Sequence, residues 1–376
     1  MASVEKRTRD GAVTWLVRWR DPDGAQRKKT FARKTDADRH LIGVESRMLS
    51  GEYVDPARSR ITVQVWAGQW LAGQVQLKES TRVRYEGLLL GHVLPRWGRV
   101  PLAKIGHADV AAWVADLSVS GLSASSVRHA HRVLSLLLAL AVRDGRISRN
   151  PAEGVRLPRA RKAEKRFLTH EQVAALADAA GEYRLAILIL AYCGLRYGEL
   201  AGLRVGRVDL LRRRLDVAQT LTEVSGRLVT GTPKTHQCRS VPVPRSLVDA
   251  LAVHMAGKSA DDLVFTAPEG GPLRLTNFRR RAFDPAARAA GLDGLTPHEL
   301  RHTAASLAVS AGANVKAVQR MLGHASAAMT LDVYAGLFDD DLDAVADRMD
   351  AAAAAAVPPA CPGGTVADLF ERRAAR

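Results

Sequence analysis

Residues 298–302 read HELRH and combine histidine, glutamate and arginine on one predicted helix. Two histidines four residues apart share a helix face and, with the glutamate between them, match the pattern of zinc peptidases. A catalytic zinc needs a third protein ligand, yet the positions three and six residues after His302 are alanines. Arg301 lies one turn from His298 and would bring a permanent positive charge close to the metal. The stretch therefore suits an anion such as phosphate better, and we expect no metal.

Four stretches in the second half of the chain form a pattern that none of them establishes alone. They are GLRYGEL at 194–200, TPKTHQCRSVPVP at 232–244, HELRHT at 298–303 and LGHASAAMTLDVY at 322–334. In this order and spacing they resemble the tyrosine recombinases, the family of the phage integrases, over about residues 60–350. The resemblance implies a mainly α fold with small β-sheets (α+β), in which a helical core-binding bundle precedes a mixed α/β catalytic domain. It also implies a site-specific DNA recombinase that integrates or excises a phage or mobile element.

The resemblance assigns a role to each matching residue. It implies two catalytic arginines, a hairpin lysine, two histidines and a nucleophile, which are Arg196 and Arg301, Lys234, His298 and His324, and Tyr334. Glu199 stands where the family commonly has an acid, and we expect it to orient Arg196 or a neighbouring histidine. The chain departs from the family at Gly336, where many members have histidine, and at Glu299, where aspartate is commoner. The position of Gly336 is not part of the core set, and Glu299 can still serve as the acid of the capping box, so activity is still expected.

These residue types suit the cleavage of DNA by phosphoryl transfer. The transition state gains charge on the non-bridging oxygens, to which a planar guanidinium can donate paired hydrogen bonds. A tyrosine hydroxyl has a pKa of about 10, so Tyr334 needs a base or a cationic surround, and His298 is the candidate base. We expect His324 to donate to the phosphate and Lys234 to protonate the leaving 5′ oxygen. A 3′-phosphotyrosine product keeps the bond energy, so no cofactor is expected.

Each candidate also has a purely structural interpretation. Tyr334 could be a packing residue, Lys234 a solvated turn residue, and His324 only a cap after a short helix. Arg196 could pair with the dipole at the end of an apolar helix, and His302 is expected to be a buried structural histidine. The joint occurrence of the candidates at the family's spacing favours the catalytic interpretation.

Helices, with one small sheet, must position these residues. Residues 296–299 read TPHE, a capping box with proline at the first helical position, so a helix is expected from there to about Gly312. A short helix over 314–322 precedes His324, and the apolar residues 182–193 predict a buried helix before Arg196. Residues 215–243 alternate between turn signals, which predicts an antiparallel sheet.

The first 55 residues predict a small sheet with one helix. Residues 12–20 alternate with a period of two, a turn follows at 21–24, and QRKKTFARK supplies a second, basic strand. Thr35 with Asp38 is expected to cap a helix that ends near Leu49. Residues 1–55 resemble the arm-type DNA-binding domains that precede the core-binding bundle in integrases.

The remaining organisation follows from helical periodicity and from proline and glycine. A helix capped by Thr62 and helices over about 79–94, 107–119 and 123–143, separated by residues such as Pro95, predict a core-binding bundle. We expect five parts in all: an arm-binding domain at 1–55, the bundle at 60–148, a basic exposed linker at 149–166, the catalytic domain at 167–350 and a flexible tail at 351–376.

Positive charge dominates the composition. Lys and Arg number 55 against 39 Asp and Glu, a net charge of +16 with a pI near 10.3, which favours a polyanionic partner. The excess is concentrated in residues 59–165, with 17 Lys and Arg against 7 Asp and Glu, whereas residues 335–376 are acidic. The candidate DNA-binding residues are Arg18, Arg20, Lys28, Lys29, Arg82, Arg84, Arg128, Arg132, Arg161 and Lys162. The expected partner is therefore double-stranded DNA.

Assembly and compartment follow from the resemblance and the composition. Exchange of two duplexes takes four active sites, which implies a homotetramer on DNA, and the acidic stretch 339–350 with the following alanines would dock as a helix on the neighbouring protomer. A DNA-bending or directionality protein would be an accessory partner. The three cysteines match no metal or disulfide spacing, which indicates the cytoplasm. The longest apolar run, 185–195, is too short to cross a membrane.

Three other functions remain open on the sequence. A non-catalytic DNA-binding regulator is one, because residues 301–334 offer a helix, a turn at Gly312 and a second helix that imitate a helix-turn-helix. A type IB topoisomerase-like enzyme would share the chemistry without exchanging partners. A zinc peptidase would be sensitive to chelators. The basic N-terminal domain and the tail favour the recombinase.

Overall fold

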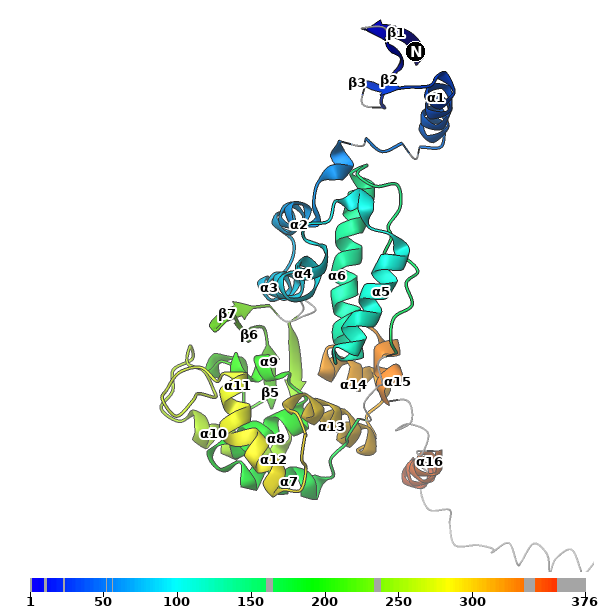
Figure 1. Cartoon of the computed structure of the whole chain (residues 1–376). Helices are drawn as coiled ribbons and strands as arrows, with labels where there is room; N and C mark the ends of the chain where they lie inside the picture. Colours follow the sequence, from blue (N-terminus) through cyan, green and yellow to red (C-terminus); the bar gives the residue numbers. More distant parts are fainter. Residues whose placement is uncertain are drawn as a thin grey trace, which may run out of the picture. The chain divides into compact units, whose positions relative to one another are not determined.

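The computed structural model (Figure 1) describes residues 2–9, 12–22, 24–51, 53–55, 57–159, 165–232, 238–334 and 342–356. Helices dominate these residues, and the strands among them form small antiparallel sheets. The chain divides into two compact units, Met1–Ala163 and Glu164–Arg376. The predicted fold class, mainly α with small β-sheets, is confirmed. No helix among the described residues is both long and apolar enough to span a lipid bilayer.

The N-terminal residues form the predicted sheet with one helix. Strands pair antiparallel in the order β1 (Ser3–Arg9), β2 (Ala12–Arg20) and β3 (Gln26–Phe31), and α1 (Lys34–Leu49) packs on one face. The predicted cap Thr35 is wrong, because α1 already begins at Lys34 and its N-cap is Arg33, which makes no side-chain hydrogen bond. The Lys34 ammonium lies 5.6 Å from the centroid of the Trp15 ring, a cation–π contact that favours this earlier start.

A helical bundle follows in the same unit. Its helices are α2 (Val63–Ala72), α3 (Glu79–Leu88), α4 (Leu94–Trp97), α5 (His107–Val119) and α6 (Ala124–Arg143). Trp66, Trp97 and Trp113 are buried in its core, and the Trp66 indole donates to the carbonyl of Leu137 at 3.0 Å. Pro95 does not end the helix as predicted. A π-helical turn over Leu89–Val93 joins α3 to α4, and this wider turn accommodates a residue that lacks a backbone donor.

The described part of the segment 149–166 differs from the expected exposed linker. Ala152 and Val155 are buried in the core of the bundle, and the buried His131 ring lies 2.9 Å from the Ala152 carbonyl. The Asn150 side chain donates to the Ser135 carbonyl at 3.1 Å. Residues 149–159 therefore pack on the bundle, because they carry apolar side chains between their arginines. Residues 160–164 lie outside the described residues.

The second unit surrounds small sheets with helices. Its helices are α7 (His170–Ala179), α8 (Arg184–Cys193), α9 (Tyr197–Ala201), α10 (Val248–Met255), α11 (Leu275–Phe278), α12 (Asp284–Ala289), α13 (Pro297–Ser310), α14 (Val315–Leu322), α15 (Ala327–Tyr334) and α16 (Leu342–Ala356). Its strands are β4 (Val208–Asp209), β5 (Arg214–Val217), β6 (Thr220–Val224), β7 (Arg227–Gly231) and β8 (Arg239–Pro242). They form two sheets, β4-β5-β8 and β6-β7, where one was predicted. A turn at Ser225-Gly226, where both residues have positive φ, joins β6 to β7.

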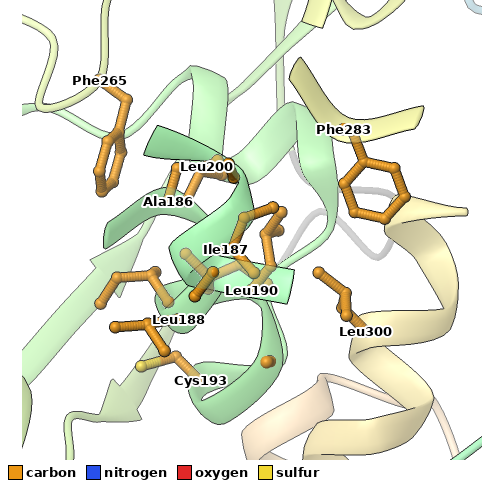
Figure 2. Packing of buried hydrophobic residues seen from close by; sticks show 14 of the residues in the cluster. Ala186, Ile187, Leu188, Leu190, Cys193, Leu200, Phe265, Phe283 and Leu300 are labelled. Atoms are coloured by element: carbon orange, nitrogen blue, oxygen red, sulfur yellow. The ribbon is translucent and has the colours of Figure 1, made fainter. Parts of the chain in front are cut away.

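Helix α8 is the centre of the second core. Figure 2 shows its side chains, including Ile187, Leu190 and Cys193, among Leu300 of α13 and Phe283 and Phe265. Fully burying a side chain of this size contributes about 1.5–3 kcal/mol. Because α8 packs directly against α13, the residues that follow α8 lie beside the first turns of α13.

Helix α16 extends beyond the predicted start of the tail. The expected flexible tail begins at residue 351, but the helix runs from Leu342 to Ala356. Alanine has the highest helix propensity of the amino acids, so the alanine run prolongs the helix.

Candidate active site

Helix α8 ends in a glycine that shapes the first part of the site. Gly194 is left-handed, with φ of +65°, and a Cβ there would lie 2.9 Å from Leu322 and 3.2 Å from Ala304. Only glycine fits both this conformation and this space. The chain then turns so that Arg196 becomes the N-cap of α9. The Arg196 side chain is one-quarter exposed, so its guanidinium reaches the surface of the unit.

Arg301 joins three parts of the second unit from a buried position on α13. Its side chain donates to the Gly194 carbonyl at 2.6 Å and to the Leu322 carbonyl. The residue is 3% exposed. A buried guanidinium needs such acceptors, because burial of a charge without hydrogen bonds is very costly. Arg301 therefore links α13 to the C-terminal ends of α8 and α14.

Glu199 is the anionic centre between two arginines. Its carboxylate accepts hydrogen bonds from Arg196 Nη1 at 2.8 Å and from Arg239 Nη1 and Nη2 at 2.9 and 2.6 Å. Burial alone would raise the pKa of Glu199, but the hydrogen bonds and charge of Arg239, followed by the Arg196 amide and charge, lower it to about 2. Glu199 thus contacts Arg196 directly, and its role in orienting that arginine stays a prediction.

Arg239, at the start of β8, is a site residue that the sequence analysis missed. Besides holding Glu199, it donates from Nε to the Met321 carbonyl at 3.0 Å, and a Cβ on Gly323 would lie 2.8 Å from its Cδ. The residue is contained in the stretch 232–244 that carries the resemblance. Its partner, however, lies forty residues earlier, and no local spacing could reveal that pairing.

His324 follows the left-handed Gly323 after α14. Its Nδ1 lies 3.0 Å from the Thr330 hydroxyl oxygen. Burial, followed by the charges of Arg301 and Arg196, lowers the pKa of His324 to about 4. The ring is therefore neutral at pH 7, and one of its two nitrogens carries the single proton.

His298 and His302 stand on the first turns of α13. Their rings meet edge to face at 5.2 Å between centroids. His302 was expected to be buried, but it is half-buried. Burial, followed by the charges of His298 and Lys165, lowers its pKa to about 4. The predicted capping box at the start of α13 is present. The Glu299 carboxylate accepts a hydrogen bond from the Thr296 amide at 2.7 Å. Among the described residues no group of three or more His, Cys, Asp or Glu could hold a metal ion.

Two candidates are described less completely. Lys234 lies outside the described residues. Tyr334 is the last residue of α15, and the structure describes its backbone. The site thus brings together Arg196, Glu199 and Arg301 with His324.

Three of the four basic candidates on the N-terminal sheet share one face. Arg18 pairs with Lys28 across β2 and β3, and Arg20 stands two residues further on the same side. Lys29 pairs with the buried Val17 and therefore lies on the side of α1, with its ammonium 5.1 Å from the Phe31 centroid. The open face consequently carries Arg18, Arg20 and Lys28.

The candidates of the bundle gather on α3 and α6, which pack together. Arg84 Nη2 lies 3.0 Å from the His129 ring, and burial, followed by the charges of Arg84 and Arg132, lowers the pKa of His129. Arg128 donates to the Pro158 carbonyl at 3.3 Å. Arg82, Arg84, Arg128 and Arg132 are all exposed. Arg161 and Lys162 lie outside the described residues.

Known proteins resemble this chain in sequence and in fold. Residues 166–340 match the phage integrase family. The integrase of Mycobacterium phage L5 is 30% identical over 320 residues, which are 81% of this chain and 85% of that protein. The tyrosine recombinase XerC of Corynebacterium efficiens is 31% identical over 238 residues, 60% of this chain and 72% of that protein. The solved Tn1549 transposon integrase, in complex with a circular intermediate DNA, shares the fold with a TM-score of 0.68 at 24% identity, covering 77% of this chain and 99% of that chain.

The fold, with arginines and a neutral histidine gathered beside α8, defines a site-specific recombinase, an enzyme that breaks and rejoins DNA. The chain belongs to the phage integrase family of tyrosine recombinases. The family predicted from four short stretches is thereby confirmed.

Proposed function

We propose that this protein is an integrase that cuts and rejoins double-stranded DNA through a 3′-phosphotyrosine formed by Tyr334, to integrate or excise a phage or mobile element. One observation carries the proposal. Arg196, Arg301 and His324 meet around the ends of α8 and α14, where a buried carboxylate and main-chain carbonyls hold the arginines. Such a set of fixed donors suits a phosphodiester that gains negative charge.

Each side chain has one task in the reaction. The Tyr334 oxygen attacks the phosphorus and its proton passes to His298, while the bond from phosphorus to the 5′ oxygen breaks and Lys234 protonates that oxygen. Arg196 and Arg301 stabilise the non-bridging oxygens, to which His324 also donates. The reverse attack by a 5′ hydroxyl of another strand rejoins the DNA. Atoms and charge balance in this cycle without a metal or a nucleotide cofactor.

Two basic surfaces support DNA as the partner. The open sheet face of Arg18, Arg20 and Lys28 suits an arm site, and the exposed arginines of α3 and α6 suit the core site. Arg161, Lys162 and Lys29 would contact phosphates outside these two surfaces. Contacts of this kind position DNA through its backbone, so binding should weaken steeply with salt.

The active assembly is a homotetramer on DNA in the cytoplasm, because two duplexes present four strands to four active sites. A DNA-bending or directionality protein would set the outcome. The regulator alternative has less support, because Arg301 at the start of its proposed helix pair is buried and makes hydrogen bonds inside the unit.

The decisive experiment traps the covalent intermediate. Purified protein is mixed in EDTA with DNA taken from beside its own gene, and an SDS-resistant protein–DNA adduct is sought. We expect an adduct with the unsubstituted protein and with Tyr192→Phe, a matched change of another tyrosine in the same unit, but none with Tyr334→Phe, which should still bind the DNA. An adduct with Tyr334→Phe would exclude Tyr334 as the nucleophile. Absence of any adduct on bound DNA would favour the regulator.

A further inference from the structure

Thr330 occupies an unusual place for a polar side chain. It lies in the first turn of α15 and is fully buried, and its hydroxyl oxygen is 3.0 Å from His324 Nδ1. A buried hydroxyl must be hydrogen-bonded to offset the loss of water, and here an imidazole of the site provides the partner.

The backbone of His324 is held from the other side, by α14. The His324 amide donates to the Gln319 carbonyl at 3.1 Å, and the Gln319 side chain donates to the His324 carbonyl at 3.2 Å. The left-handed Gly323 completes this turn. Helix α14 therefore fixes the backbone of His324, whereas Thr330 contacts its imidazole ring.

The hydrogen bond between Thr330 and His324 can have two directions. If the ring carried its proton on Nδ1, Nε2 would present a lone pair to an anionic phosphate oxygen and repel it. If the threonine hydroxyl donates to Nδ1, the proton must be on Nε2, which can then donate to phosphate. The low pKa of His324 limits the ring to one proton at neutral pH, so the two arrangements exclude each other.

We propose that Thr330 is a positioning residue that donates its hydroxyl proton to His324 Nδ1 and thereby fixes the Nε2–H tautomer needed for donation to phosphate. The role of His324 rests on the proposed function. Tyr334 follows in the same helix, one turn after Thr330. The same hydrogen bond therefore links the helix that carries the nucleophile to a donor of the phosphate site, so that docking of α15 and preparation of His324 occur together.

The tautomer can be measured without DNA. Nitrogen chemical shifts of the 15N-labelled full-length protein at pH 7.5, with His324 assigned by its loss in His324→Gln, identify which ring nitrogen carries the proton. We expect Nε2–H in the unsubstituted protein and in Thr330→Ser, which keeps the hydroxyl. The isosteric Thr330→Val should shift the ring toward Nδ1–H or a mixture. Nδ1–H in the unsubstituted protein would overturn the proposal, whatever the variants do.

Adduct formation provides the second readout. We expect Thr330→Val to slow it about 10- to 100-fold, as the loss of a hydrogen-bond partner does for histidines that bind a metal. Its Kd for DNA should stay unchanged, and Thr330→Ser should remain close to the unsubstituted protein. Slow adduct formation in Thr330→Val with an unchanged tautomer would show a packing role only and reject the inference. The proposed function would then still stand on the adduct of the unsubstituted protein.

Discussion

Arg239 controls the charge at the centre of the site although it is not among the family residues that the sequence identified. Its side chain is 9% exposed, and its guanidinium donates to both oxygens of the fully buried Glu199 carboxylate. Arg196 donates to the same carboxylate, so Arg239 positions Arg196 indirectly, through Glu199. The two arginines thus depend on one acid, and a change at either should be felt by the other.

Replacing Arg239 should damage both stability and catalysis. Arg239→Met leaves Glu199 with one cationic partner, and removal of one member of a buried ion pair typically costs about 3–5 kcal/mol. We expect a lower free energy of unfolding in urea and slower adduct formation, with partial recovery in Arg239→Lys, which keeps the charge without the fork. The exposed Arg227→Met is the matched control on β7. Equal stability of Arg239→Met and the control would contradict this account.

Acid should destabilise the second unit in two ranges of pH. His302 and His324 have folded pKa values of about 4, below the ordinary value of 6.5, because burial disfavours their charged forms. Between these values the unfolded chain binds more protons, so the free energy of unfolding falls as pH decreases from 6.5 toward 4. Glu199, with a folded pKa of about 2 against an ordinary 4.5, continues the loss below pH 4.5.

Urea unfolding at pH 7.5, 6 and 5 measures the first range. His302→Gln removes one of the two histidines and should flatten the dependence, whereas His170→Gln, at an exposed position on α7, should leave it steep. A free energy of unfolding that stays level across this range would refute the burial of neutral histidines.

At the scale of elements, the turn after α14, which leads to α15, packs against Arg239 at the start of β8. Gly323 has φ of +64°, and a Cβ added there would lie 2.8 Å from Arg239 Cδ, whereas Gly291 has φ of +69° with nothing within 4 Å of an added Cβ. An alanine in this conformation costs about 1–2 kcal/mol at either position. Gly323→Ala should also displace Arg239, and we expect it to be less stable than Gly291→Ala and much slower in adduct formation. Similar adduct rates for the two variants would mean that the turn tolerates the shift.

Local patterns predicted most of these elements, whereas long-range pairings escaped them. The TPHE capping box and the left-handed glycines determine helix ends that hydrophobic periodicity alone does not locate. Helix α5 has the predicted bounds. Three features were not predicted: the pairing of Glu199 with Arg239, the packing of Ala152 on the bundle, and the side of the sheet on which Lys29 lies. Each depends on where a distant segment folds back, which residue types and spacing do not encode locally. Pro95 was misjudged because a π-helical turn cannot be recognised from proline alone.

At the scale of the whole molecule, the acidic end of the chain is the candidate contact between protomers. Residues 335–376 hold 4 Lys and Arg against 8 Asp and Glu, so this end has no electrostatic attraction to DNA. Deletion of residues 338–376, which contain α16, should weaken recombination and leave binding to a single core site intact. Deletion of residues 357–376 alone is the matched control and should preserve recombination. Unchanged recombination after the longer deletion would reject a docking role for α16.

The way Arg301 is held has a consequence for engineering. Two of its acceptors are the main-chain carbonyls of Gly194 and Leu322, and every amino acid has such a carbonyl. Substitution of Leu322 by another apolar residue of similar volume keeps the acceptor, whereas its size is constrained because Leu322 is fully buried beside Gly194. Libraries that retarget such an enzyme to new genomic sites can therefore vary residue 322 among apolar side chains of similar volume without removing this acceptor of Arg301.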